Sequence, residues 1–407
     1  MYSRFIEAGI PLDRIELAIS SGSYSSFIAE LGSSSDKKDT DASYRPCDVG
    51  IIGPGDFGVA LSASLKESTN IQFYDTEPVR NIFSSVTRIS TNRSFAHRFG
   101  MNVSFTSDLS KVLEARFIIL CVPANVVPTM IDKIKEIIPQ GYKDKQYVLV
   151  SKGFIGKGYI PHRWLQKNGI PFERIIWASG GNVAREVMDK RSFNISVVSV
   201  NKNRRARREF ASFFNKDYLV PLEYSGSALL ACELGGILKN YYAGFGRYIL
   251  SKYGEEGLKK YKYMVRSEFR KSVRMVSSSP TVSIRAWVIR KASHGPAFWE
   301  DLDVTVRDGR NGFFGEGVFA GGSVKKALDD LGLVESFKTV FSTLSLFNRL
   351  SRRAFKRLSV LKGILEIYEE LHIEYLESGD AHISEDSKKI IKKLEEKTLA
   401  YRRYWLF

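Results

Sequence analysis

Short apolar runs alternate with helical stretches through the first half of the chain. Each run is continuous in apolar residues and ends at a glycine, a proline or a polar residue, which is typical of strands buried on both faces. Between them lie stretches such as 126–138, in which apolar residues recur at helical spacing. This alternation predicts a parallel sheet covered by helices on both faces, and therefore an α/β domain. The predicted strands read DVGIIG, IQFYD, ARFIILCVP, QYVLVSKG, RIIWASGG and FNISVVSV.

The pattern changes after about Tyr218, where nearly every stretch becomes helical. The last of these, 384–405, begins with a serine and has the spacing of an amphipathic helix. Residues 32–46 are polar, rich in serine and close with a proline, which indicates a flexible linker. The sequence therefore predicts an N-terminal extension and linker at 1–46, the α/β domain at 47–221, a helical domain at 222–375 and a charged C-terminal helix at 376–407.

The chain is basic, and the excess charge is concentrated in one span. Its 407 residues carry a net charge of +16, and residues 202–291 contain 19 Lys or Arg against 7 Asp or Glu, a difference of +12. A basic balance favours partners that carry phosphate or other negative groups. We expect a phosphate-bearing small molecule and do not expect nucleic acid. A basic surface that binds polyanions is the alternative.

Cysteine, histidine and apolar-run patterns bear on the cellular location. Cys47, Cys121 and Cys232 form no pair motif, and the five histidines show no metal-ligand spacing. This predicts a reducing compartment, no disulfide framework and no metal site. No apolar run has the length of a membrane span, and the first residues lack the apolar core of a signal peptide. We therefore expect a cytoplasmic protein without a membrane span.

A glycine-rich loop follows the first predicted strand and opens a helix. It reads GPGDFG, a G-x-G-x-x-G pattern in the strand–loop–helix setting that this motif requires. Such a loop lets the backbone and a helix N-terminus approach a pyrophosphate. Asp75 ends the next strand, 22 residues after Gly53, where a carboxylate can bind a ribose hydroxyl and repel a 2′-phosphate. The pattern predicts NAD as the cofactor, with a plain glycine turn as the alternative. The expected cofactor contacts are Gly53, Gly55, Asp56, Phe57, Gly58 and Asp75.

Two lysines lie where a ligand could meet them. Lys152 follows a predicted strand, at the sheet edge where ligands bind in such folds, and a solvated surface lysine is the alternative. Lys239 lies in the helical stretch ELGGILKN, one turn after Gly235, and Asn240 lies one turn after Gly236. Two glycines in a helix interior cost about 2 kcal/mol relative to alanine. They predict either a bare helix surface that a ligand approaches or close packing against another segment.

A third cluster, DLDVTVRDGRNGFFGEG, begins at Asp301. Asp301 and Thr305 are four residues apart, so a helix would place them on one face. Arg310 and Asn311 stand beside glycines, at an expected loop or helix start. Because arginine binds phosphate through two parallel hydrogen bonds, this pair is a candidate phosphate site. A polar surface turn is the alternative.

The order of these motifs resembles the NAD-dependent glycerol-3-phosphate dehydrogenase family over about residues 48–340. ELGGILKN is close to the family signature E-L-x-G-x-[LM]-K-N. Six further motifs keep the family order, and together they are far more specific than any one of them. They are Gly53–Gly58, Val122-Pro123, Lys152-Gly153, Ser179–Val187, Asp301–Thr305 and Gly309–Asn311.

The resemblance implies a Rossmann domain followed by an all-α domain like the C-terminal domain of 6-phosphogluconate dehydrogenase, in a homodimer. It also implies reversible hydride transfer between NADH and dihydroxyacetone phosphate, a phosphorylated triose. Gly235 and Gly236 would leave room for nicotinamide and substrate beside Lys239, the acid/base, with Lys152 and Asp301 as the other catalytic residues. The implied substrate-binding residues are Lys152, Asn182, Asn240, Thr305, Arg310 and Asn311. The further implied cofactor contacts are Pro123, Lys152, Ala184, Arg310 and Glu335.

The sequence also departs from the family pattern. Asp56 and Phe57 stand where the family usually has an aromatic and a small residue. The stretch after Gly244 has no counterpart of an asparagine that the family places near the active site. Two alternatives therefore stay open. One is a related dehydrogenase for another phosphorylated or acidic carbonyl compound, and the other is a non-enzymatic Rossmann-type binding protein with a basic surface.

Overall fold

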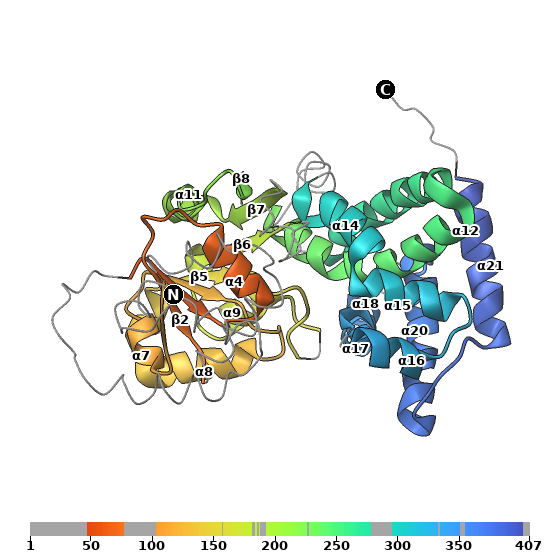
Figure 1. Ribbon diagram of the computed structural model, residues 1–407, viewed down its shortest axis with the longest axis horizontal. Coiled ribbons are helices and arrows are strands. Elements are labelled where there is room, and N and C mark those ends of the chain that lie inside the picture. Colours follow the sequence, from red (N-terminus) through yellow and green to blue (C-terminus); the bar gives the residue numbers. More distant parts are fainter. Residues whose placement is uncertain are drawn as a thin grey trace, which may run out of the picture.

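The structure, a computed structural model, consists of two lobes that meet near the centre of Figure 1. One lobe contains the strands, and the other consists of helices. The predicted extension and linker at 1–46 and the candidate residue Asn182 lie outside the described residues. The structure describes residues 47–76, 103–156, 158–180, 184, 187, 193–225, 228–277, 295–332, 334–350 and 355–401.

The described strands form one eight-stranded sheet. They are β1 (Val49–Ile52), β2 (Ile71–Tyr74), β3 (Val103–Thr106), β4 (Phe117–Leu120), β5 (Gln146–Leu149), β6 (Ile175–Ser179), β7 (Phe193–Ser199) and β8 (Leu219–Ser225). Their order across the sheet is β3-β2-β1-β4-β5-β6-β7-β8. The strand order reverses next to β1, which pairs in parallel with both β2 and β4. Ligands of open α/β sheets bind beyond the carboxyl ends of the strands at such a reversal.

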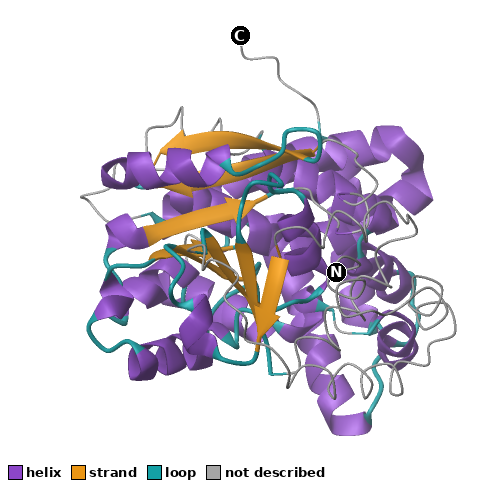
Figure 2. Ribbon diagram, turned by 60° about the vertical axis from the view of Figure 1, so that its left-hand side comes forward, coloured by secondary structure: helices purple, strands orange, loops and turns teal. Residues whose placement is uncertain are grey.

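Strand side chains point alternately into two apolar cores. In β1, Ile51 belongs to a core shared with α4 (Asp56–Ala63) and α11 (Arg204–Ser212). Ile52 belongs to a second core, which continues into the helical lobe. Because both faces are buried, β1 and β4 are apolar throughout, which explains the continuous runs in the sequence. Figure 2 shows helices on both sides of the sheet. The helices on the second face are α7 (Leu109–Val112), α8 (Val127–Ile137) and α9 (Pro161–Lys167).

The strand directions are less uniform than the sequence predicted. The strands from β3 to β6 across the sheet pair in parallel, but β7 is antiparallel to β6 and parallel to β8. An apolar run does not reveal direction, because a buried strand has the same composition either way. β8 ends at Ser225, beyond the predicted domain end at 221, and contains Pro221. Proline is tolerated there because β8 is an edge strand.

One long helix, α12 (Leu229–Val276), forms the centre of the second lobe. It is interrupted at Gly254, where φ is 64° and ψ is −167°, a conformation that only glycine adopts at little cost. The chain therefore turns there, and the two parts of α12 lie in the same lobe (Figure 1). Helices that follow are η5 (Pro296–Glu300, a π-helix), α14 (Asp301–Asp308), α15 (Arg310–Phe319), α16 (Val324–Leu331), α17 (Glu335–Lys338), α18 (Val340–Leu350), α20 (Ser359–Ser378) and α21 (Glu385–Leu399). Short 3₁₀ turns are η1 (Gly141–Lys143), η2 (Phe172–Arg174) and η3 (Asn201–Asn203).

The charged C-terminal helix α21 is packed onto the rest of the helical lobe. Glu395 of α21 accepts hydrogen bonds from Lys252 and Tyr248 of α12, at 2.7 and 2.6 Å. The second part of α12 in turn supports α20, because the buried Glu268 carboxylate accepts the backbone N–H of Val360 at 2.9 Å. The predicted architecture, an α/β Rossmann domain followed by an all-α domain, is confirmed. The predicted domain boundaries stay predictions.

Three further features concern spans, metals and thiols. Within the described ranges, no helix combines the length and the apolar character needed to cross a membrane. No group of three or more His, Cys, Asp or Glu side chains in those ranges could hold a metal ion. All three cysteines are free thiols.

Candidate active site

The glycine-rich loop joins β1 to α4 at the point where the strand order reverses. Gly53 has a φ of 103°, and a Cβ there would lie 2.5 Å from the carbonyl oxygen of Cys121. A Cβ at Gly58 would lie 2.4 Å from the carbonyl oxygen of Gly53. At Gly55, by contrast, no atom of the described residues beyond its chain neighbours lies within 4 Å of the Cβ position. The outer glycines therefore shape the turn, and the middle one leaves the backbone open to a ligand.

The surroundings of this loop fit a dinucleotide. The open backbone at Gly55 leads directly into the N-terminus of α4, whose partial positive charge favours a pyrophosphate. The N–H of Gly53 donates to the carbonyl of Tyr74 at 3.2 Å, which brings Asp75 next to the loop. The Asp75 carboxylate accepts the N–H of Thr76 at 2.8 Å. Both parts of the predicted fingerprint, loop and acid, thus meet at one edge of the sheet.

A buried carboxylate holds two ammonium groups from different elements. Asp301, the first residue of α14, lies 2.7 Å from Nζ of Lys239 through Oδ1 and 2.7 Å from Nζ of Lys152 through Oδ2. The Asp301 side chain is 3% exposed and that of Lys239 is 8% exposed. Lys239 also donates to Oγ1 of Thr305 at 2.7 Å, and Thr305 donates to the Asp301 carbonyl at 2.6 Å. The four-residue spacing of Asp301 and Thr305 does place both on one face.

Lys152 reaches this carboxylate from the sheet. It follows β5, and its ammonium also donates to the carbonyl of Gly180, just after the neighbouring strand β6, at 3.0 Å. The carboxyl ends of two adjacent parallel strands therefore position it. Its side chain is 20% exposed, so solvent or a ligand can reach the group. The site is thus assembled from the sheet, α12 and α14.

The two glycines of ELGGILKN do not leave a bare surface, so that interpretation of the sequence was wrong. A Cβ at Gly235 would lie 2.9 Å from the carbonyl oxygen of Ala297 in η5. A Cβ at Gly236 would lie 3.0 Å from the Trp177 ring and 3.6 Å from Cγ of Lys152. Both glycines permit close packing against protein, which was the alternative. Periodicity shows which face a glycine lies on but not what covers that face.

The predicted substrate-side residues differ in accessibility. Asn240 is 4% exposed, and its side-chain oxygen has no hydrogen-bond partner in the described part of the chain. Asn311 is equally buried, and its side-chain oxygen accepts the N–H of Ser336 at 3.0 Å. Arg310, at the start of α15, is exposed and makes no ion pair with a described residue. Of these three residues, Arg310 is therefore the one placed to meet a ligand at the surface.

Two titratable groups beside the site have a raised pKa. Burial raises the pKa of Glu300, which directly precedes Asp301, although its carboxylate accepts hydrogen bonds from Asn194. The Cys121 thiol lies beside the glycine-rich loop, 3.3 Å from the Cβ position of Gly58. Although Cys121 is partly exposed as a residue, desolvation of the thiol raises its pKa to about 12. Thiolate chemistry at Cys121 is therefore disfavoured near neutral pH.

A buried contact between a carboxylate and a histidine joins the two lobes, and the sequence did not predict it. Glu233, the first residue of the ELGGILKN motif, is fully buried. Its carboxylate accepts the backbone N–H of His162 at 3.0 Å and contacts Nδ1 of the same histidine. This contact fixes the start of α9 against α12, below Lys239. No local signal pairs two residues that lie 71 positions apart.

Comparison with known proteins agrees with this geometry. Residues 48–205 match the family described as NAD-dependent glycerol-3-phosphate dehydrogenase N-terminus. An NADP(+)-dependent glycerol-3-phosphate dehydrogenase of Archaeoglobus fulgidus is 26% identical over 352 residues, which cover 80% of this chain and 96% of the relative. The chain is therefore similar to NAD-dependent glycerol-3-phosphate dehydrogenases, over residues 48–205 in the family match and over most of its length in this relative.

Further relatives extend the similarity over most of the chain. A glycerol-3-phosphate dehydrogenase [NAD(P)+] of Ruthia magnifica is 24% identical over 310 residues, 74% of this chain and 88% of the relative. The glycerol-3-phosphate dehydrogenase structure from Coxiella burnetii has a TM-score of 0.65 at 16% identity, covering 86% of this chain and 99% of that one. The Saccharomyces cerevisiae enzyme structure also has a TM-score of 0.65, at 15% identity, covering 86% and 100%. These structures share the fold of both lobes.

The remaining positions that the family resemblance assigned to the cofactor are scattered around the same sheet edge or lie beyond it. Pro123 follows β4, next to the glycine-rich loop. Ala184 packs against the apolar core that contains α4. Glu335 is the first residue of α17, beside the N–H that Asn311 accepts. Their roles, like those of the other candidate site residues, stay predictions.

Proposed function

We propose that this chain catalyses reversible hydride transfer between NADH and dihydroxyacetone phosphate, with sn-glycerol 3-phosphate as the reduced product. The observation that carries the proposal is the buried Asp301 carboxylate, which binds Lys239 and Lys152 at the same carboxyl edge of the sheet as the glycine-rich loop. When bound, the nicotinamide supplies the hydride equivalent, and the protein positions it. The match of residues 48–205 to the family and the relatives' names support the choice of substrate.

Lys239 is proposed as the acid/base. Reduction of a carbonyl puts negative charge on its oxygen, and an ammonium held in a site with little water stabilises that charge strongly. Lys239 can then donate a proton to the oxygen, and in the reverse direction it accepts the proton. Asp301 and Thr305 hold its Nζ from two sides, each at 2.7 Å, so the group is fixed before substrate arrives. Lys152 adds a second positive charge across the same carboxylate.

The phosphate of the substrate is assigned to Arg310. Its guanidinium is exposed at the start of α15, where the helix N-terminus adds partial positive charge. Asn311 follows Arg310. Its side-chain oxygen already accepts the N–H of Ser336, and an oxygen would in any case repel a phosphate, so only its amide N–H groups suit a phosphate. Asn240, with its unpaired buried oxygen, suits a substrate hydroxyl. Asn182 and Thr305 complete the proposed set of substrate-binding residues. Thr305 would act on the substrate indirectly, by holding Lys239.

The direct test is NADH oxidation, followed by absorbance, with purified protein and dihydroxyacetone phosphate. We expect turnover that saturates with dihydroxyacetone phosphate and that glycerol 3-phosphate plus NAD⁺ reverses. A panel of other phosphorylated and acidic carbonyl compounds serves as the control for substrate identity. Faster turnover of another compound in the panel would reassign the substrate and keep the mechanism. No turnover of any compound, together with salt-dependent polyanion binding, would favour a binding protein instead.

Arg310→Lys is expected to raise KM for dihydroxyacetone phosphate about tenfold or more. Lysine keeps the charge but cannot form the two parallel hydrogen bonds of a guanidinium. Losing one charged hydrogen bond costs about 1.5–3 kcal/mol, and each 1.4 kcal/mol corresponds to about tenfold in affinity. Unphosphorylated dihydroxyacetone is the matched control, because it lacks the group that Arg310 would bind. If both substrates respond alike in steady-state kinetics, Arg310 does not bind the phosphate.

Asp75 is expected to make NADH the preferred cofactor over NADPH. Its carboxylate lies beside the glycine-rich loop and would repel a 2′-phosphate. The measurement is kcat/KM for the two cofactors in the wild type and in Asp75→Asn, which keeps the shape and removes the charge. We expect the preference for NADH to fall in the variant. An equal or reversed preference in the wild type would show that Asp75 does not select the cofactor. A reversed preference would match the name of the NADP(+)-dependent relative.

The assembly is proposed from the family resemblance, and the location from the cysteine pattern. We propose a homodimer in the cytoplasm, without a bound metal. The three free thiols suit a reducing compartment. Light scattering on the purified protein gives the mass of the assembly, and cell fractionation gives its location. A monomer at micromolar concentration would contradict the first part.

A further inference from the structure

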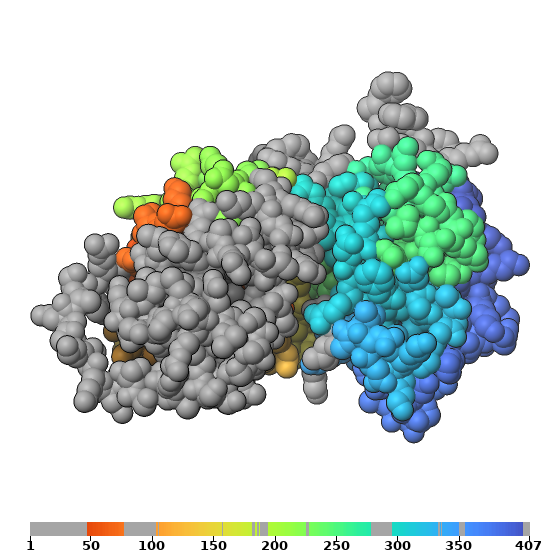
Figure 3. Space-filling view, viewed as in Figure 1, coloured from red at the N-terminus to blue at the C-terminus, as the bar shows by residue number. Residues whose placement is uncertain are grey.

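The segment that carries Asp301 lies along α12 and is held at both ends. It consists of η5, α14 and α15, the cyan stretch beside green α12 in Figure 3. α14 has eight residues, which corresponds to a length of about 12 Å. Lys239 and Arg247 are eight residues apart on α12, which also corresponds to about 12 Å and places both side chains on one helix face. The spacing of the two cations along α12 therefore equals the length of α14, so that one cation can lie at each end of α14.

At the N-terminal end, the π-helix η5 rests on Gly235. A Cβ at Gly235 would lie 2.9 Å from the Ala297 carbonyl oxygen and 3.0 Å from Cβ of Phe298. The Phe298 ring stacks on Phe269 of α12 at 3.9 Å between centroids, so η5 has little room to move aside. η5 runs directly into α14, and Asp301 follows its last residue. The distance between η5 and Gly235 of α12 therefore determines the position of Asp301.

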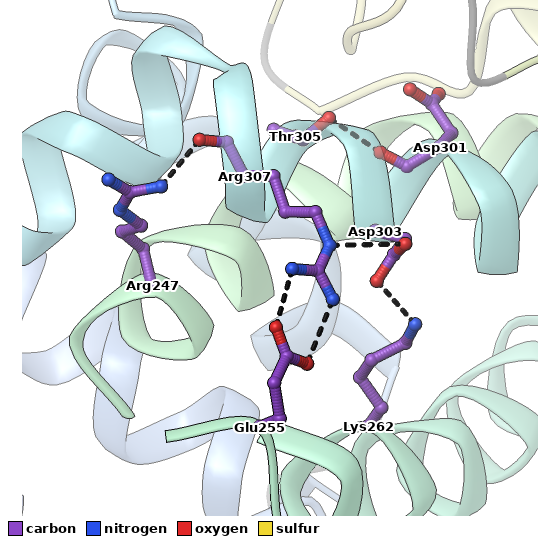
Figure 4. A network of polar contacts seen from close by, with 7 residues as sticks. All are labelled: Arg247, Glu255, Lys262, Asp301, Asp303, Thr305 and Arg307. Atoms are coloured by element: carbon purple, nitrogen blue, oxygen red, sulfur yellow. Dashed lines mark hydrogen bonds and ion pairs between the residues drawn. The ribbon is translucent and has the colours of Figure 1, made fainter. Parts of the chain in front are cut away.

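At the C-terminal end, Arg247 binds the backbone of α14. Its Nη1 donates to the carbonyl of Arg307 at 2.5 Å, and its Nε donates to Glu316 of α15 at 2.9 Å, the first of which is drawn in Figure 4. A cation at this end also complements the partial negative charge of the helix C-terminus. Next to it, Gly246 lets α14 approach closely, since a Cβ there would lie 2.9 Å from Cγ2 of Val306. The Arg247 side chain is 24% exposed, so the contact is mostly shielded from water.

We propose that Gly235 and Arg247 are positioning residues, which fix the place of α14 along α12 and thereby hold the Asp301 carboxylate between Lys239 and Lys152. The consequence for catalysis rests on the proposed function, whereas the placement of Asp301 does not. A short helix of two turns has little stability of its own, so its contacts decide its position. A shift of α14 along α12 would move Asp301 and Thr305 together relative to Nζ of Lys239.

The outer ion pairs of the same region are a weaker means of holding α14. Figure 4 shows Arg307 bound through two hydrogen bonds to Glu255, and Lys262 bound to Asp303. The Arg307 and Glu255 side chains are 39% and 68% exposed. Exposed ion pairs contribute little, because water and salt screen them. They provide the matched controls.

The experiment compares Gly235→Ala and Arg247→Met with two controls. Gly317→Ala adds a Cβ to a helical glycine of α15 with no atom within 4 Å, and Arg307→Gln removes an exposed side chain but keeps the carbonyl that Arg247 binds. The first readout is the rate at which an amine-reactive reagent labels Lys239, measured by peptide mass spectrometry on folded protein. The second is kcat and KM for dihydroxyacetone phosphate, with the Kd for NADH measured separately. Thermal unfolding checks that each variant is folded.

We expect Lys239 labelling to rise several-fold in Gly235→Ala and Arg247→Met, and kcat to fall about tenfold or more, because a displacement of about 1 Å can cost about a hundredfold. The Kd for NADH should stay unchanged, and Arg247→Lys should keep part of the kcat that Arg247→Met loses, because its ammonium can still donate to the Arg307 carbonyl. Labelling and kcat equal to the controls in both variants would overturn the proposal. If Gly235→Ala fails to fold, Arg247→Met decides alone. If the wild type does not turn over the triose, the labelling rates still decide the placement of Asp301, and only the proposed function fails.

Discussion

Lys239→Ala is expected to abolish turnover while leaving NADH binding intact. Lys239 is the buried ammonium that Asp301 and Thr305 hold from two sides, each at 2.7 Å. Losing a positioned general acid lowers a rate by about 10²–10⁴-fold, and loss of the charge that stabilises the developing oxyanion adds to this. The measurement is kcat by NADH oxidation, with NADH binding followed by fluorescence titration.

The matched control for this prediction is Lys259→Ala. Lys259 lies on the same helix, but its side chain is 63% exposed, and among the described residues it pairs only with Glu256, at 3.9 Å. Its removal should leave kcat unchanged. Turnover by Lys239→Ala close to the wild-type rate would rule out Lys239 as the acid/base and would direct attention to Lys152.

Asp301→Asn is expected to destabilise the fold and to lower kcat together. The substitution leaves two ammonium groups next to a neutral amide, with the Lys239 side chain only 8% exposed. Removing one partner of a buried ion pair costs about 3–5 kcal/mol, and the lower end applies here because asparagine keeps a hydrogen-bond acceptor and Lys152 is partly hydrated. The free energy of unfolding comes from denaturant titration, and kcat from the same assay.

Asp303→Asn provides the control on the same helix. Asp303 pairs with Lys262 at 2.6 Å, but its side chain is 35% exposed, and pairs of this kind contribute about 0–1 kcal/mol. We expect kcat to stay unchanged. Equal losses of stability in the two variants would contradict the view that Asp301 is the central ionic contact of the site.

The sequence alone determined features whose geometry is local. The pattern GPGDFG between a strand and a helix predicted a phosphate-binding turn, and the positive φ of Gly53 and the open backbone at Gly55 agree with it. The spacing of Asp301 and Thr305 predicted one helix face, and both bind Lys239. The turn and the shared helix face agree with the structure because a short pattern fixes backbone conformation and side-chain direction within a few residues, whereas phosphate binding by the turn stays a prediction.

The tertiary structure decided which surfaces those local elements meet. The double glycine could be assigned to a helix face, but only the fold shows that η5 covers Gly235 and that Trp177 covers Gly236. In the same way, the direction of β7 depends on its pairing with β6, which no apolar run records. Contacts such as Glu233 with His162 join residues far apart in the chain. Packing partners follow from the summed contacts of the whole chain, so the pattern of one segment predicts its face and not its neighbour.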